Sequence, residues 1–434
     1  MQEQGKIPFL SAVLMSINVI VGVGIYFGPQ LMVARAGSMS FLGWIVAGIL
    51  LFPVIWNVAL AARMFPGSGG FYNYCKQGLG ERWGFIAVWA YLLGFLATAA
   101  MQITALRDAA AFQWGQASFP VLVGSVFIIN LLLVAILSYL NTLEVGLISR
   151  IQSVATVLKI LPMVIVALTF VFYWKMPFTF DWSNLTAVGY TLPTAIFGYW
   201  GFESACSISH LIKGGPTRAS SVILTAFFIV AMLYTTFHFG VMCIMGVPSV
   251  ELLGATMFPA YMGIASQGLL AVIKVGMGLI FLLAFFNAAY GVMLANVTNI
   301  SSLAQKNLLF GSSLFTKVNR FDRPILPILM QCLVVWALMS FVPHKEILIA
   351  LANFGVIIAM VLTITAVAFQ QIKKKEVVPF AVSCAAYASC AVLIFFSWND
   401  LGATSVMRFM ALVPLLVGLV AGFGMYCIKK GSCA

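Results

Sequence analysis

Charged residues are scarce in this sequence. Of its 434 residues, 8% are Asp, Glu, Lys or Arg, against roughly 25% in an ordinary soluble domain, and only 11 are acidic. By contrast, 62% are hydrophobic and the mean hydropathy is +1.07. A soluble fold could not bury that much apolar surface. The composition therefore excludes a soluble globular protein and predicts an integral membrane protein.

Several patterns that carry chemistry are also missing. The eight cysteines show no CxxC or CxxH spacing, and the three histidines, His210, His238 and His344, form no cluster, so no metal site is predicted. A nucleophile with a base, or a pair of carboxylates, is not found within the apolar segments, so an enzyme is not expected and no cofactor is implied. Channels use rings of repeated polar groups, and no such repeat is seen.

Apolar runs of about 20 residues, the length needed to span a bilayer, recur along the whole chain. They predict an all-α membrane protein with about 12 transmembrane helices in a single domain, residues 1–434, without a soluble module. Two polar stretches are predicted as connectors, an extracellular loop at 249–262 and a cytoplasmic segment at 299–323. The predicted spans are 8–35, 41–62, 83–106, 119–140, 147–174, 186–211, 219–246, 267–298, 325–342, 346–369, 378–397 and 408–428.

The distribution of Lys and Arg gives an orientation, because cytoplasmic loops carry the excess of positive charge. With both termini inside, sixteen of the 23 basic residues lie on the cytoplasmic side and five outside. We therefore expect a multi-pass protein of the plasma (inner) membrane with both termini cytoplasmic. The net charge of +12 then needs no nucleic-acid partner. The run Lys373-Lys374-Lys375 is read as a topology signal, with contact to anionic membrane lipid as the alternative.

Glycine interrupts two of the predicted helices at mid-span. The first break is Gly22-Val23-Gly24, and the second contains Gly198 and Gly201. A break exposes backbone polar groups inside a bilayer, which is tolerated only where they face protein or a solvated cavity. The pair therefore predicts a binding site. The alternative is that these glycines only let helices pack closely.

The two breaks offer opposite charges to a ligand. Where the first helix resumes, the free amides of Gly24, Ile25 and Tyr26 form a helix N-terminus, which attracts a carboxylate. At the second break, the carbonyls of Phe197 and Gly198 end a half-helix and accept hydrogen bonds from an ammonium group. A zwitterionic α-amino acid fits both ends, and the breaks do not determine the identity of its side chain.

The second break lies five predicted helices after the first. This spacing indicates two five-helix repeats of opposite topology, because an odd number of spans inverts the second copy. Repeat 1 would cover about 8–174 and repeat 2 about 186–369, followed by two extra helices at about 378–428. The repeat is inferred from the positions of the breaks alone.

Three segments resemble a known family. They are "GVGIYFGP" in the first predicted helix, "FPGSGGFYNYCKQGLGERWGF" between the second and third, and "FGYWGFESACSISHLIKGGPTRAS" in the sixth. They are similar to the amino acid/polyamine/organocation (APC) transporters, and the resemblance covers essentially the whole chain. It implies the leucine-transporter fold, a 5+5 inverted repeat plus two helices, and amino acid transport by alternating access. The sequence departs from the family at Val23, where small hydroxyl residues are frequent.

The resemblance also implies roles for residues near the second break. Family members place a gating aromatic where this chain has Phe197, six residues before Glu203. Trp200 is expected to limit the side-chain pocket. Tyr290 and Asn287, in the eighth predicted helix, are candidates by their depth in the span alone.

Ionisable residues inside spans cost at least ~2.5 kcal/mol at the bilayer centre, so each is a functional candidate. Proton-coupled family members carry a lysine at the position of Lys159, against the first break, where sodium-coupled relatives hold their ion. Lys159 is therefore expected to couple protons to transport, or alternatively to be a fixed structural charge in an exchanger. Glu203 is expected to gate the inward path. Lys274 either snorkels to the interface or admits anionic substrates.

Together these features predict a secondary transporter that moves a small amino acid by alternating access as a proton symporter. The alternatives are an amino-acid or polyamine exchanger and a sensor that binds an amino acid without moving it. The expected partners are the amino acid or a related amine, protons and membrane lipid.

Overall fold

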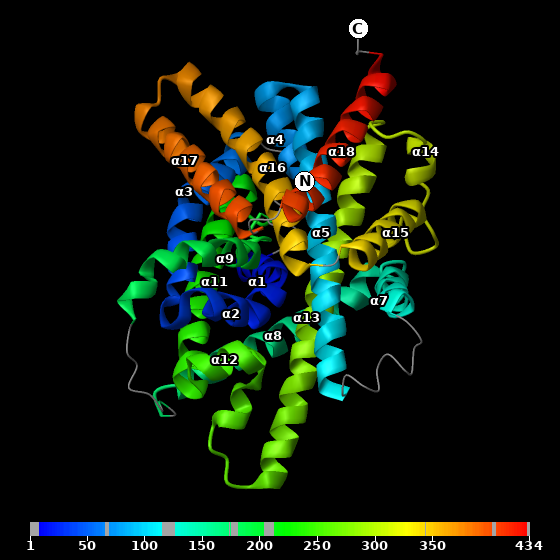
Figure 1. Ribbon diagram of the computed structural model, residues 1–434. Helices are drawn as coiled ribbons and strands as arrows, with labels where there is room; N and C mark the ends of the chain where they lie inside the picture. The colour runs from blue at the N-terminus through cyan, green and yellow to red at the C-terminus, as the bar shows by residue number, and fades with distance from the viewer. Residues whose placement is uncertain are drawn as a thin grey trace.

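The computed structural model describes residues 8–65, 69–114, 126–172, 174, 181–203, 212–342, 344–401 and 405–431. These residues form a bundle of helices (Figure 1). No β-strand occurs in the described ranges, where the one β-bridge pairs Val318 with Pro324. The prediction of an all-α fold is confirmed.

The described elements follow one another along the chain. In order they are α1 (Phe9–Ile20), α2 (Val23–Ala36), η1 (Gly37–Met39), α3 (Leu42–Met64), α4 (Gly70–Leu79), α5 (Glu81–Trp114), α7 (Val126–Leu140), α8 (Val145–Thr169), η2 (Trp182–Thr191), α9 (Leu192–Tyr199), α11 (Gly215–Met245), α12 (Val247–Leu253), η4 (Ala255–Tyr261), α13 (Gln267–Gln305), α14 (Ser312–Phe315), α15 (Ile325–Phe341), α16 (Lys345–Lys374), α17 (Val377–Asp400) and α18 (Ser405–Lys430).

A multi-pass membrane protein is supported by the length and apolar character of these helices. Among the described residues, seven helices are long and apolar enough to span a bilayer, namely α3, α5, α11, α13, α16, α17 and α18. The bent pair of α1 and α2 makes an eighth. Shorter apolar segments are Val126–Leu140, Val154–Thr169 and Ile325–Phe341, and the predicted range 186–211 contains α9, which has eight residues. The count of about 12 spans and the inverted repeat stay predictions.

The centre of the bundle is formed by α5, which packs along both α13 and α16 (Figure 1). Glycine lets two of these backbones approach closely. A Cβ on Gly94 of α5 would lie 2.9 Å from the carbonyl oxygen of Ala352, and a Cβ on Gly355 of α16 would lie 2.7 Å from that of Ala90. Small residues at such a crossing are typical of helices packed in a membrane.

Two predicted connectors have more helix than expected. Residues 249–262, predicted as a connecting loop too short to span the membrane, lie almost wholly in the short elements α12 and η4, so this connector is helical. These helical turns pack beside α2, where the Gln30 amide donates a hydrogen bond to the Glu251 carbonyl at 3.0 Å. The segment predicted at 299–323 begins with the last turns of α13 and contains α14, so only part of it is a connector.

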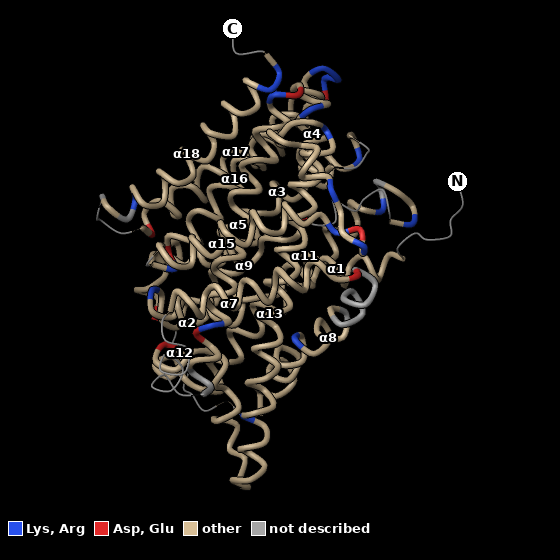
Figure 2. The backbone as a smooth tube through the Cα atoms, turned by 90° about the vertical axis from the view of Figure 1, so that its right-hand side faces the viewer, with Lys and Arg blue, Asp and Glu red and all other residues tan. Residues whose placement is uncertain are grey.

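Lys and Arg gather around α4 and the last turns of α18, and charge is sparse along the middle of the bundle (Figure 2). This distribution follows the predicted separation of basic loops from apolar spans. Which end faces the cytoplasm stays a prediction, because the orientation rests on the sequence rule alone.

Candidate functional site

The first break separates α1 from α2. Helix α1 ends at Ile20, α2 begins at Val23, and the two helices are bent by 44°. No side chain caps the N-terminus of α2 at Gly22. The amides of the first turn, including those of Gly24 and Ile25, therefore lack an intrahelical acceptor and form the positive end of a helix dipole.

The second break follows α9, which ends at Tyr199. Trp200 leaves the helix with ψ 138°, and Gly201 has φ +117°, a left-handed conformation that favours glycine. The predicted continuation of this span, with His210, lies outside the described residues. The break itself is where the sequence placed it.

The two breaks lie against each other. A Cβ on Gly24 would be 2.3 Å from the Cα of Gly198, far closer than real Cβ contacts. A Cβ on Gly201 would be 2.8 Å from Cγ1 of Val19, in the last turn of α1. Segments far apart in the chain therefore meet at their glycines (Figure 1, α1, α2 and α9). The same glycines break the helices and let them pack closely, and the binding site at the breaks stays a prediction.

The carbonyls at the second break have partners in this structure. The Tyr234 hydroxyl, from α11, lies 3.1 Å from the Gly198 oxygen and 2.9 Å from the Ile20 oxygen. The Trp200 amide donates to the Phe197 oxygen at 3.4 Å. Both carbonyls therefore have a donor from the protein itself. Each carbonyl still has a second lone pair for a ligand ammonium.

Lys159 joins α8 to the first break. The Lys159 side chain is fully buried, and its ammonium donates hydrogen bonds to the Asn18 carbonyl at 2.6 Å and the Asn18 Oδ1 at 2.7 Å. The Asn287 amide donates to the same Oδ1 at 2.8 Å. Asn18 lies in the last turn of α1, where the break leaves carbonyls without intrahelical partners and a cation is favourable. Lys159 forms no ion pair with any described carboxylate.

Glu203 is held at the second break by two donors. It is 1% exposed; the Tyr91 hydroxyl donates to its Oε1 at 2.9 Å and the Gly201 amide donates to its Oε2 at 3.0 Å. Tyr91 lies in α5. The carboxyl group therefore ties the turn at Gly201 to the central helix of the bundle.

The remaining predicted residues are buried around the breaks. The Trp200 indole donates to Asn353 Oδ1 at 2.7 Å and so points toward α16. Phe197 is 5% exposed, in the last turn of α9. Tyr290 is buried in α13, three residues after Asn287 and on the same side of that helix. No hydrogen bond within the described part of the chain joins Tyr290 to either break, so its role stays a prediction.

A cavity of about 880 Å³, which we call the outer cavity, reaches the first break from the end predicted to face outward. Its lining includes Tyr26, two residues after Gly24, and the rings of Phe281 and Phe285 in α13. The Tyr26 ring centroid lies 5.0 Å from that of Phe281 and 6.1 Å from that of Phe285, at steep angles. An aromatic cluster therefore lines this cavity where it meets α2.

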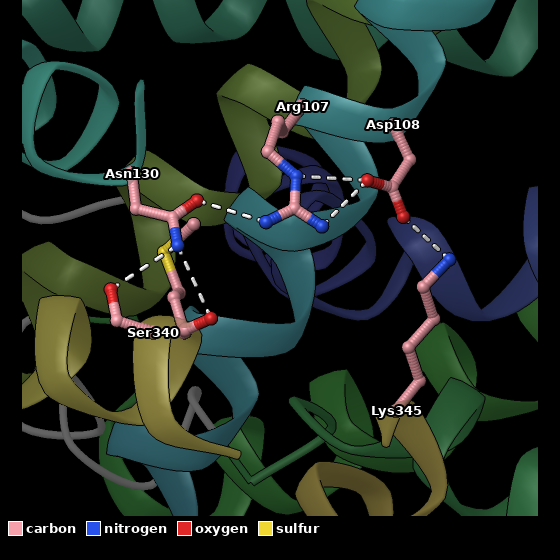
Figure 3. Close-up of polar contacts among 6 residues, drawn as sticks. Arg107, Asp108, Asn130, Ser340 and Lys345 are labelled. Atoms are coloured by element: carbon pink, nitrogen blue, oxygen red, sulfur yellow. Dashed lines mark hydrogen bonds and ion pairs between the residues drawn. The ribbon is translucent and has the colours of Figure 1, made fainter. Parts of the chain in front are cut away.

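Charged side chains line the mouth of the outer cavity. Asp108 Oδ2 forms an ion pair with Lys345 Nζ at 2.6 Å, and Asp108 Oδ1 lies 2.8 Å from the Arg107 guanidinium (Figure 3). Nη1 of the same Arg107 guanidinium donates a hydrogen bond to Asn130 Oδ1 at 2.9 Å. Lys274 also lines this cavity, and the choice between snorkelling and admitting anionic groups stays a prediction.

The comparisons with known proteins identify the family. A family model described as amino acid permease matches residues 7–422 of this chain. The chain belongs to this family. The expected resemblance to the APC superfamily is thereby confirmed, and the permease is an amino acid transporter rather than an enzyme.

Relatives of this permease include one of matching length. The serine/threonine exchanger SteT of Bacillus subtilis is 25% identical over 446 residues, which covers 98% of this chain and 97% of SteT. Shorter matches include the uncharacterized transporter Rv1999c of Mycobacterium tuberculosis, 36% identical over 101 residues and 23% of each chain. The L-asparagine permease of Streptomyces coelicolor is 29% identical over 93 residues, 21% of this chain and 19% of that permease.

Sequence reasoning missed several polar side chains at the breaks of this permease. Gln102 of α5 has its Oε1 3.1 Å from where a Cβ on Gly22 would lie, and that oxygen is buried without a hydrogen-bond partner in the described structure. Asn18 accepts hydrogen bonds from Lys159, and the Tyr234 hydroxyl lies within hydrogen-bond distance of the carbonyls at both helix ends. One signal was present: Asn and Gln inside apolar spans are costly and mark functional positions.

Proposed function

We propose that this permease carries a small amino acid by alternating access and couples the movement to a proton. The substrate's α-carboxylate binds the amides of the α2 N-terminus, at Gly22, Val23, Gly24 and Ile25. Its ammonium group binds the carbonyl end of α9. The uncapped N-terminus of α2 and the direct contact between the two breaks support this placement.

The observation that carries proton coupling is the pair of hydrogen bonds from Lys159 to Asn18. A charged ammonium makes strong bonds to a carbonyl and an amide oxygen, whereas a neutral amine makes weaker ones. Loss of the proton from Lys159 therefore weakens the attachment of α1 to α8. Since α1 ends at the substrate site, proton binding and the position of α1 become linked equilibria. Glu203, which anchors the other break, gates the inward path.

Exchange is the second candidate. SteT, the relative of matching length, is named as an exchanger. Lys159 also has two good acceptors and no carboxylate partner among the described residues, which suits a permanent structural cation as well as a titrating one. In an exchanger, the lysine keeps its proton and holds α1 through every step.

Proteoliposomes separate the two mechanisms. An inward proton gradient without sodium is expected to accelerate uptake of labelled L-serine and L-alanine, and Lys159→Ala is expected to remove that acceleration while the protein still folds. Lys317→Ala, at an exposed lysine, is the matched control. Uptake that ignores the gradient and requires internal amino acid would instead establish exchange. Amino acid binding without any flux would establish a sensor.

We also propose the predicted orientation, with both termini cytoplasmic in the plasma membrane. A membrane-impermeant amine reagent added to whole cells is then expected to label Lys345 and to spare Lys373, Lys374 and Lys375. The reverse pattern of labelling would invert the topology.

A further inference from the structure

A second, smaller cavity of about 340 Å³ lies between α5, α13 and α14, and we call it the inner pocket. It shares no lining residue with the outer cavity. It lies at the end of α13 that is predicted to face the cytoplasm. Its polar lining includes Thr298, Ser301, Ser302, Thr316, Asp322 and Arg323.

Arg323 is the least satisfied polar group of this pocket. Its side chain is nine-tenths buried, with 9% of the residue exposed. Its Nε donates to the Asn141 carbonyl at 2.9 Å, but its Nη2 is buried and has no hydrogen-bond partner among the described residues. No described carboxylate forms an ion pair with it. A buried cation without a counter-charge is strongly destabilising, so an anion bound at Arg323 would stabilise this pocket.

The chain holds this guanidinium in place before any ligand arrives. Asn319 Oδ1 accepts the backbone amides of Phe321 at 2.9 Å and Arg323 at 3.0 Å. The Asn319 amide in turn donates to the Thr142 carbonyl at 2.8 Å, which fixes the turn to the connection between α7 and α8. A donor that is already ordered loses little entropy when it binds, which favours affinity.

The chemistry of the lining selects one class of anion. A guanidinium binds carboxylate or phosphate through parallel hydrogen bonds. Asp322 lines the same pocket, and its negative charge opposes a phosphate dianion but pairs with an ammonium group. The volume falls in the range of about 300–1,000 Å³ that is usual for small-molecule sites.

We propose that the inner pocket is a second amino acid site, which binds the α-carboxylate at Arg323 and the α-ammonium at Asp322. The proposal rests on the proposed function only in its choice of ligand class, because the pocket lies apart from the broken helices. A site at this end senses the amino acid on the predicted cytoplasmic side.

Calorimetric titration of the purified full-length permease with L-serine tests the proposal. Arg323→Gln is expected to weaken one class of site roughly ten- to a hundred-fold. Arg320→Gln removes an exposed positive charge three residues away and is the matched control. Thr316→Phe fills the pocket from an exposed lining position and leaves the contacts of Arg323 intact, so it tests the site even if Arg323→Gln fails to fold.

The outcomes distinguish the two amino acid sites. Gly24→Ala is expected to weaken serine binding at the broken helices and to leave the Arg323-dependent site unchanged. If the proposed substrate site at the broken helices does not exist, the titration of the wild type shows a single class of serine site. Arg323→Gln and Thr316→Phe then remove that class. Serine binding that both variants leave unchanged overturns the inner site. Competition by inorganic phosphate at a lower concentration than by acetate also overturns it, since the pocket is then a phosphate site.

Discussion

The contact between Gly24 and Gly198 gives the sharpest test of the substrate site. An alanine at position 24 places its Cβ 2.3 Å from the Gly198 Cα, whereas ordinary contacts begin at 3.4 Å. The two broken helices must therefore separate by about 1.1 Å. Backbone atoms cannot rotate out of the way, so the strain falls on the site itself, at a cost of about 1–3 kcal/mol for an overpacked core.

In a transporter this cost appears in the conformation that binds substrate. If it falls wholly on that state, Gly24→Ala weakens amino acid binding roughly 5- to 150-fold. The measurement is equilibrium binding and proteoliposome uptake of labelled L-serine on the same preparation. Gly48→Ala in α3 is the control, because a Cβ there first meets an atom at 3.7 Å, an ordinary contact. Wild-type binding and uptake in Gly24→Ala, with normal folding, would refute the assignment of this contact to the substrate site.

Three further predictions follow from buried polar contacts. Trp200→Phe removes the donor to Asn353 and leaves a buried acceptor unpaired, so the free energy of unfolding is expected to fall by about 1–3 kcal/mol, measured by thermal or denaturant unfolding. Asp108→Asn removes the carboxylate that pairs with Lys345, which is expected to lower stability by about 1 kcal/mol and to strengthen competition by anionic amino acids in uptake assays. Glu203→Gln replaces one carboxylate oxygen with an NH2 group, which then faces the donor of Tyr91 or of Gly201 and cannot accept its hydrogen bond. Transport is therefore expected to fall at least about tenfold while the purified protein stays folded.

Controls and contrary results can be stated for each of these. Trp56→Phe, at an indole that is 42% exposed, should leave the free energy of unfolding unchanged. An equal decrease of that free energy in both tryptophan variants would show that the Trp200 hydrogen bond is not its cause. A double-mutant cycle of Asp108 and Lys345 with no coupling would show that the ion pair is inert. Wild-type transport by Glu203→Gln would exclude the carboxyl group from gating.

The breaks were predictable because glycine in an apolar helix is a local signal. Gly22, Gly24, Gly198 and Gly201 stand out against their neighbours, and the structure interrupts α1 and α9 at these positions. The contact of Lys159 with the first break was implied by the family resemblance. The structure adds Asn18 as its partner, which no sequence pattern identified.

Other features could not be predicted because they depend on distant contacts or on short elements. Tyr234 is one tyrosine among 13, and its partners lie 36 and 214 residues away in the chain. Helix α12 has seven residues, too few to show a helical period, so the sequence predicts only a connector there. The inner pocket combines residues of four segments, and its chemistry becomes visible only when burial and unpaired atoms are known.

The hydroxyl of Tyr234 has one proton and two carbonyl oxygens within reach, at Ile20 and at Gly198. The ends of two broken helices therefore compete for a single donor. In the proposed function, a substrate ammonium that binds the Gly198 carbonyl would leave the Tyr234 proton to bond the Ile20 carbonyl alone, which would strengthen the contact of α11 with the end of α1. Substrate binding at one half-helix would then affect the other through a shift of one hydrogen bond.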